Sequence, residues 1–180
     1  MRELTRKQKL ALTRYRKILV IVGLDEQELL SRAEDDPEAI VPVLDLMVDQ
    51  VVRSEVITTY TWLDSILNSV LTDRIAGTQN SSIGPNRRKT LALVLDRLYP
   101  LQKLAIIRTF KKVPKKINSS IGAIDELRNG LAHSFHVSSL PKHRRTYKGQ
   151  NIFTPAGLEL FRSESQEVAA YFDPILRKFL

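Results

Sequence analysis

Residues able to do chemistry gather in one short stretch, DELRNGLAHSF, which runs from Asp125 to Phe135. It contains Arg128, Asn129 and His133, and His133 is one of only three histidines in the chain. A neutral imidazole takes up protons near neutral pH. A guanidinium pairs with phosphate and stabilises negative charge as it builds. Together they suit phosphodiester cleavage, and in RNA the substrate's own 2′-hydroxyl can be the nucleophile, so neither a metal nor an enzyme nucleophile is needed.

Helical geometry limits how these residues can act together. At about 100° per residue, Asp125, Asn129 and His133 share the face opposite an apolar stripe. Arg128 and His133 lie about 140° apart and cannot aim at one point on an undistorted helix. Either Gly130 relaxes the turn, or a symmetric dimer completes the pair. Asp125 either orients Asn129 or is a solvated acid, and we slightly favour the solvated acid. The stripe consists of Ile117, Ile121, Ile124, Leu127, Leu131 and Phe135.

The segment LRNGLAHS resembles the signature of the HEPN superfamily, an Arg, a polar residue and a His four to six residues after the Arg on a helix of an all-α bundle. An Arg followed by His at one of three such spacings arises by chance about 0.8 times in a chain of this composition, and about 0.03 times with Asn directly after the Arg. The resemblance implies that Arg128 contacts phosphate and His133 acts in acid/base chemistry. Asn129 would orient one of them or the RNA.

The same resemblance implies a metal-independent endoribonuclease of toxin–antitoxin, phage-defence or RNA-processing type. Such enzymes act as homodimers with a composite Arg/His cleft, so the expected partners are RNA, a second copy and an antitoxin or regulator protein. In one toxin subgroup the antitoxin modifies a Tyr two residues after the His. Here that residue is Phe135, which has no hydroxyl, so this route of silencing is not expected.

Two alternatives to a ribonuclease remain open. Other HEPN members have lost catalysis, so the chain is alternatively an inactive module that binds nucleic acid or a partner protein. A sequence-specific DNA regulator is a weaker third interpretation, because no short helix–turn–helix pair stands out.

The net charge of +8 is unevenly distributed along the chain. Residues 87–116 hold ten basic residues against one Asp, and residues 142–148 add four more without an acid. These blocks predict a surface for a polyanion, although a solvated basic face is equally compatible with charge alone. The candidate RNA contacts are Arg87, Arg88, Lys89, Arg144, Arg145 and Lys148.

The sequence predicts that the elements which position the motif and the basic residues are helices. We expect an all-α, up-down bundle of four to five main helices, with a very long central helix and a small β-hairpin before the last helix. The expected helices cover 5–22, 25 to before Asp36, 38–75, a segment capped by Asn86 and kinked or divided by Pro100, a segment from near Lys115, and 155–178. The hairpin turns at Lys148–Gly149, and Thr154 caps the last helix.

Residues 1–180 are thus expected to form a single HEPN-like helical domain. Tyr60, Trp62 and Tyr99 are expected in the core, with stacking on RNA bases as the weaker alternative. The acids Glu55 and Asp64 are expected to be exposed and unpaired, with support of the site from behind as the weaker alternative.

Composition restricts the function classes further. The chain has no cysteine, which excludes disulfides, thiolate zinc sites and cysteine nucleophiles, and its three histidines lack HExxH spacing. The first residues do not resemble a signal peptide, and no apolar run approaches the roughly 18 residues that a membrane-spanning helix needs. We therefore expect a soluble, cytoplasmic protein without a cofactor.

Overall fold

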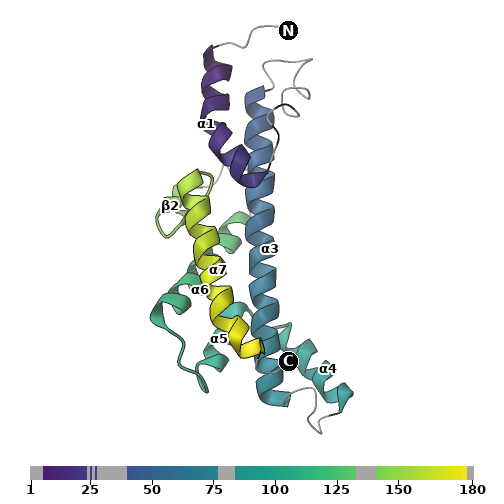
Figure 1. Cartoon of the computed structure of the whole chain (residues 1–180). Helices are drawn as coiled ribbons and strands as arrows, with labels where there is room; N and C mark the ends of the chain where they lie inside the picture. The colour runs from purple at the N-terminus through teal and green to yellow at the C-terminus, as the bar shows by residue number, and fades with distance from the viewer. Residues whose placement is uncertain are drawn as a thin grey trace.

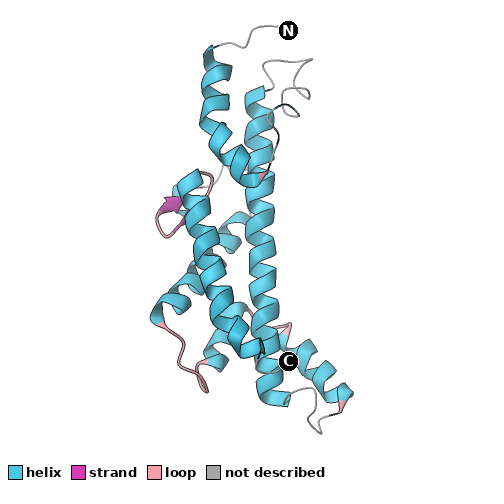
Figure 2. Cartoon of the chain, in the orientation of Figure 1, coloured by secondary structure: helices cyan, strands magenta, loops and turns pink. Residues whose placement is uncertain are grey.

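The computed structural model describes residues 6–23, 25, 27, 40–76, 84–132 and 141–177. It confirms the predicted architecture, because the long helices are joined by shorter ones and a two-stranded antiparallel hairpin precedes the last helix (Figure 2). The elements are α1 (Arg6–Val22), α3 (Ile40–Ala76), α4 (Pro85–Leu95), α5 (Pro100–Ile107), α6 (Lys115–Ala132), the 3-10 helix η3 (Lys142–Arg145), β1 (Thr146–Tyr147), β2 (Gln150–Asn151) and α7 (Pro155–Arg177).

Helix α3 is the spine of the molecule, and α1, α4, α5, α6 and α7 all pack against it (Figure 1). Its 37 residues correspond to about 55 Å at 1.5 Å per residue. Pro42 lies in its first turn, where a missing backbone N–H costs little. The helix forms despite many β-branched residues because its apolar side is buried against its neighbours. Its buried positions include Leu44, Val48, Val52, Val56, Leu63, Leu67, Val70 and Leu71.

Prolines define the boundaries of α4 and α5. Helix α4 ends at Leu95, the chain turns, and α5 begins with Pro100, so the predicted division of this segment is confirmed. The prediction that Asn86 caps α4 is wrong. Gly84 is the N-cap and Pro85 is the first helical residue, because the fixed φ of proline suits that position and places Asn86 inside the first turn.

The predicted elements around the hairpin are also confirmed. The hairpin turns at Lys148 and Gly149, which have φ values of 46° and 83°, the left-handed backbone that a tight two-residue turn requires. Thr154 caps α7, since its Oγ1 accepts a hydrogen bond from the Gly157 N–H at 3.3 Å. The α6 stripe from Ile117 to Leu131 is buried as predicted, and Phe135 lies outside the described residues. The predicted helix from Asp25 lies almost entirely outside them too.

The aromatic residues are arranged differently from the prediction. Trp62 is 49% exposed and Tyr99 is 67% exposed, so the expectation that they fill the core is wrong. Trp62 lies on α3, and Tyr99 is the N-cap residue of α5. The core contains Tyr147 instead, whose ring meets that of Phe161 edge to face with centroids 5.4 Å apart. Among the described residues, no helix combines the length and apolar character that crossing a membrane requires.

Candidate functional site

Arg128 is held by contacts from two helices. Its guanidinium carbon lies 4.8 Å from the centre of the Tyr60 ring on α3, a cation–π arrangement. One of its Nη groups donates a hydrogen bond to Asn129 Oδ1 at 3.0 Å. Asn129 Nδ2 in turn donates to Asp125 Oδ2 at 3.2 Å. The slight preference for Asp125 as a solvated acid is therefore wrong, because this carboxylate orients Asn129, and Asn129 orients Arg128.

Tyr60 closes this set of contacts from the α3 side. Burial and the carboxylate of Asp125, which also hydrogen-bonds the phenol, raise the pKa of Tyr60 to about 12, although Arg128 lowers it. The phenol thus keeps its proton at neutral pH and remains a donor toward Asp125. Sequence reasoning missed Tyr60, because nothing local marks a tyrosine on a distant helix as the partner of an arginine.

The guanidinium retains donors for a ligand. Its Nε is buried and has no hydrogen-bond partner among the described residues. An unpaired buried donor is costly, so Nε is a group of the folded protein that a change of side-chain position toward an acceptor would stabilise. A half-buried guanidinium, fixed on one face and short of acceptors, is suited to pairing with phosphate.

The end of α6 is fixed just before the motif histidine. Arg53 on α3 donates a hydrogen bond to the carbonyl oxygen of Leu131. It also donates to the two carboxylate oxygens of Asp49, each at 3.1 Å. This guanidinium satisfies a carbonyl that the helix end leaves without an intrahelical partner. His133 itself and His136 lie outside the described residues, as does the side chain of His143.

Gly130 has a packing role within the motif. A Cβ atom at this position would lie 2.6 Å from the backbone oxygen of Arg144 and 3.3 Å from its Cβ. Helix α6 continues through Ala132, and Gly130 has no positive φ. The glycine therefore permits the close approach of η3, and relaxation of the turn is not needed to explain it.

The acids on α3 are paired, which corrects the expectation that they are solvated. Asp64, one turn after Tyr60, accepts a hydrogen bond from Lys103 Nζ at 2.6 Å, and Lys103 is fully buried. Glu55 binds Arg162 of α7 through two contacts of 2.5 and 2.7 Å, and Arg162 also donates to the Ile21 carbonyl at 2.9 Å. Asp64 therefore lies beside the site, and Glu55 joins α3, α7 and the end of α1.

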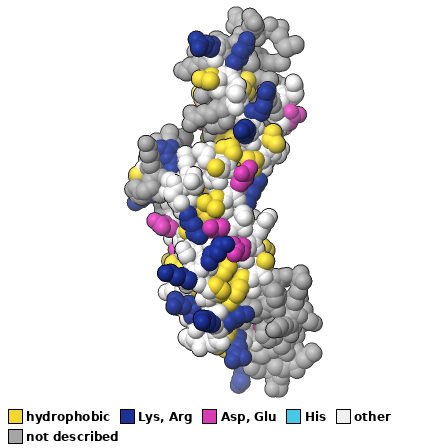
Figure 3. Space-filling model, turned by 60° about the vertical axis from the view of Figure 1, so that its left-hand side comes forward, with side chains coloured by type: hydrophobic (Ala, Val, Ile, Leu, Met, Phe, Trp, Pro, Cys, Tyr) yellow, Lys and Arg dark blue, Asp and Glu magenta, His cyan; other side chains and the backbone are white. Residues whose placement is uncertain are grey.

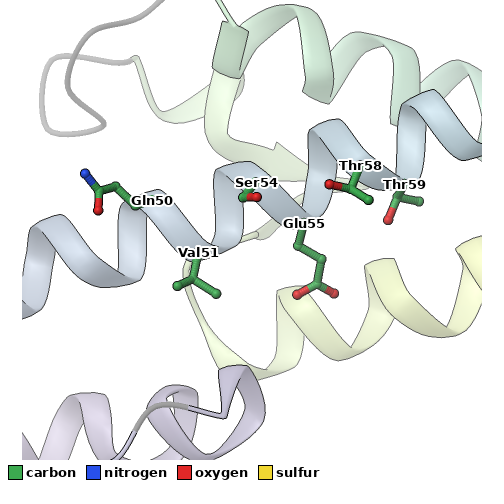
Figure 4. A pocket seen from close by; sticks show the side chains of 6 residues that line it. All are labelled: Gln50, Val51, Ser54, Glu55, Thr58 and Thr59. Atoms are coloured by element: carbon green, nitrogen blue, oxygen red, sulfur yellow. The ribbon is translucent and has the colours of Figure 1, made fainter. Parts of the chain in front are cut away.

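A shallow depression of about 410 Å³ lies beside Glu55. All of its lining side chains come from α3, and Glu55 points from them toward α7 (Figure 4). Because Arg162 already engages the only titratable group in this lining, we assign no chemistry to it. The lining residues are Gln50, Val51, Ser54, Glu55, Thr58 and Thr59.

The candidate RNA-binding residues on α4 lie in its first turns. Arg87 and Lys89 are exposed and make no ion pair with the described residues. Arg88 turns toward α3 and pairs with Asp73 at 3.2 Å. These residues pack at the Ala76 end of α3, so the structure does not bring them into direct contact with Arg128.

The candidates near the hairpin lie closer to the motif helix. Arg144 is exposed and Arg145 half-buried on η3, which packs against α6. Lys148 instead pairs with Glu164 of α7 at 2.5 Å and donates to Ser120 of α6 at 3.0 Å. Lys148 therefore anchors the hairpin and is the weakest of the RNA-binding candidates.

Neither a metal centre nor a relative is identified. Among the described residues, no three His, Cys, Asp or Glu side chains come together in a way that holds a metal ion.

Comparison with protein families, with curated proteins and with solved structures finds no match.

Proposed function

We propose that the protein is a metal-independent endoribonuclease of the HEPN type that acts as a homodimer. The observation that carries the proposal is the fixed guanidinium of Arg128, which Tyr60 and Asn129 orient while its Nε has no acceptor among the described residues. This arginine belongs to the same RNxxxH motif as the histidine that would supply acid/base chemistry.

The chemistry follows from these groups. Arg128 pairs with the scissile phosphate and stabilises the charge that builds on its oxygens. His133 takes the proton from the 2′-hydroxyl, and the 2′ oxygen forms a bond to phosphorus. The bond from phosphorus to the 5′ oxygen breaks, and that oxygen takes up a proton from an imidazolium or from water. The products are a 2′,3′-cyclic phosphate and a 5′-hydroxyl, with no other reactant consumed.

The biological setting is part of the same proposal. An enzyme that cuts RNA without a cofactor is harmful in the cytoplasm unless something restrains it. A cognate antitoxin or regulator that covers Arg128 would do so, and the proposal therefore includes a role in a toxin–antitoxin, phage-defence or RNA-processing system.

The test is cleavage of labelled single-stranded and tRNA-like RNA with and without EDTA. We expect cleavage that resists EDTA, and we expect Arg128→Ala and His133→Ala each to lower it by about 100-fold or more. Arg6→Ala, which removes an exposed arginine of α1, and His143→Ala, which removes a histidine outside the motif, are the matched controls.

Retained cleavage by a folded His133→Ala protein would contradict the proposal. If the wild type binds RNA in a salt-dependent manner but never cuts it, the inactive binding module becomes the better description.

A further inference from the structure

Tyr99 holds its aromatic ring in solvent. The side chain is 67% exposed, in the turn that joins α4 to α5. Its backbone N–H is satisfied by Gln102 Oε1 at 2.9 Å, and its backbone carbonyl accepts from the Lys103 N–H at 3.1 Å. Its backbone thus belongs to the start of α5, while the ring projects outward. Tyrosine rings usually bury most of their area, so an exposed one at a fixed position is available to a ligand.

The segment that contains Tyr99 is strongly basic. Lys and Arg side chains gather over the lower part of the face that Figure 3 shows. The one acid of residues 87–116, Asp96, accepts a hydrogen bond from Asn68 of α3 at 2.7 Å. Six exposed cations of this block form no ion pair with the described residues: Arg87, Lys89, Arg97, Arg108, Lys112 and Lys115. We call Tyr99 and these six residues, which extend along the chain from the first turn of α4 to the first residue of α6, the α4–α5 surface.

A short series of contacts joins this surface to Arg128. Tyr99 lies one helical turn before Lys103, whose Nζ binds Asp64 at 2.6 Å. Asp64 lies one turn after Tyr60, whose ring packs under Arg128. The path from Tyr99 to Arg128 thus runs along α5 to Lys103, across to Asp64 and Tyr60 of α3, and across again to α6.

We propose that the α4–α5 surface is a subsite for single-stranded RNA, in which the ring of Tyr99 stacks on an unpaired base. The inference rests on the proposed function, because it takes RNA as the substrate. Unpaired cations attract the phosphates, and an exposed ring offers the flat face that every base can stack on. A duplex hides its base faces and gains nothing from Tyr99.

The experiment measures binding by fluorescence anisotropy with labelled 2′-O-methyl oligonucleotides of about 12 nucleotides. These oligonucleotides lack the 2′-hydroxyl nucleophile, so the wild-type protein is used intact. We compare Tyr99→Ala and Tyr99→Phe with Trp62→Ala. Trp62 is the matched control because it is also an exposed aromatic residue, and it lies two positions from Tyr60, about 200° around α3. An abasic oligonucleotide of the same length isolates the contribution of stacking.

We expect Tyr99→Ala to weaken binding of the single strand by about 5- to 100-fold, and Tyr99→Phe and Trp62→Ala to change it by less than about twofold. On the abasic oligonucleotide, Tyr99→Ala should bind like the wild type. The proposal would be overturned if the wild type and Tyr99→Ala bound the single strand with equal affinity, or if Tyr99→Ala lost as much affinity for the abasic oligonucleotide as for the intact one. Binding of a duplex as tightly as of the single strand, or no RNA binding at all, would also overturn it.

Cleavage assays on the same proteins separate this inference from the proposed function. If Tyr99→Ala loses affinity for the single strand but the wild type does not cleave RNA, the subsite is supported and the proposed ribonuclease function is contradicted. Cleavage that depends on Arg128, together with unchanged affinity in Tyr99→Ala, supports the enzyme and overturns the subsite.

Discussion

At the scale of single residues, the environment of Arg128 explains why the motif contains more than an arginine and a histidine. Asn129 is adjacent in sequence and accepts from the guanidinium, and Asp125 fixes Asn129 from one turn earlier. Tyr60 supplies the face on which the cation packs. Such a guanidinium has lost much of its rotamer freedom before substrate arrives, so less entropy is lost when phosphate binds.

Substitution of Tyr60 tests whether the ring positions Arg128. We expect Tyr60→Leu to lower the cleavage rate at saturating RNA by about 2- to 30-fold, the range that a lost cation–π contact implies. Tyr60→Phe keeps the ring and should restore most of the rate. The measurement is kcat and KM for both variants beside their thermal unfolding. A Leu variant that cleaves like the wild type would show that the ring does not position the arginine.

At the scale of elements, α6 is fixed along its length by side chains from three other segments. Near its start, Ser120 Oγ donates to Glu164 Oε2 of α7 at 2.9 Å, and the same oxygen receives the Tyr147 hydroxyl at 2.7 Å. Near its end, Arg53 and η3 fix the turn that leads to the histidine. The helix that carries the motif is therefore a rigid platform for it.

Two glycines of α6 give opposite predictions. Gly130→Ala should destabilise the fold by roughly 1–3 kcal/mol, because its methyl group would meet the Arg144 backbone oxygen. Gly122→Ala should stabilise it by about 0.5–1 kcal/mol, because nothing lies within 4 Å of a Cβ there and alanine favours the helix. Urea unfolding of both proteins gives the comparison. Equal shifts of the two variants would contradict the packing role of Gly130.

The hydrogen bonds of Glu164 lead us to predict that the stability of the fold depends on pH. Burial opposes its ionisation, but hydrogen bonds from Lys148, Tyr147 and Ser120 outweigh burial and lower its pKa below the usual value. A lowered pKa in the folded state contributes stability above the unfolded pKa, and that contribution is lost as pH falls through the folded pKa. Glu164→Gln should therefore cost roughly 1–3 kcal/mol at pH 7, with a smaller difference from wild type near pH 3.

The measurement is the free energy of unfolding in urea at both pH values. Glu167→Gln is the control, since Glu167 is also on α7 but forms an exposed pair with Lys116. A Glu164→Gln deficit that stays constant with pH would contradict the assignment.

At the scale of the whole molecule, α1, α4, α5, α6 and α7 pack around α3 in an elongated bundle (Figure 1), with Arg128 half-buried on α6. The five-residue spacing of Arg128 and His133 and the absence of distortion at Gly130 favour a site shared between two subunits. In such a dimer, the arginine of one chain and the histidine of the other act on one phosphate.

Mixing two inactive variants tests this arrangement. After subunit exchange, an equal mixture of Arg128→Ala and His133→Ala proteins should recover up to about a quarter of the wild-type cleavage rate, because half of the dimers contain one intact shared site. Each variant alone is the control. No recovery from a mixture shown to exchange subunits would place both groups of each site on one chain.

Local signals predicted most of the fold. Helical periodicity located the long helices, Pro100 located the break between α4 and α5, and Thr154 with Pro155 located the start of α7. The turn at Lys148–Gly149 followed from its residue types. The prediction at Asn86 was wrong because two local preferences competed, and proline at the first helical position prevailed over a side-chain cap.

The sequence by itself determined the long helices, most of their boundaries and the motif, since periodicity, capping and turn preferences act over a few residues. Only the tertiary structure decided that Tyr60 packs on Arg128, that Glu55 pairs with Arg162 at a separation of 107 positions, and that Trp62 and Tyr99 face solvent. The physical reason is that a side chain's partner depends on which helices pack together and at what rotation about their axes. The residues of a single helix determine neither its packing partners nor its rotation against them.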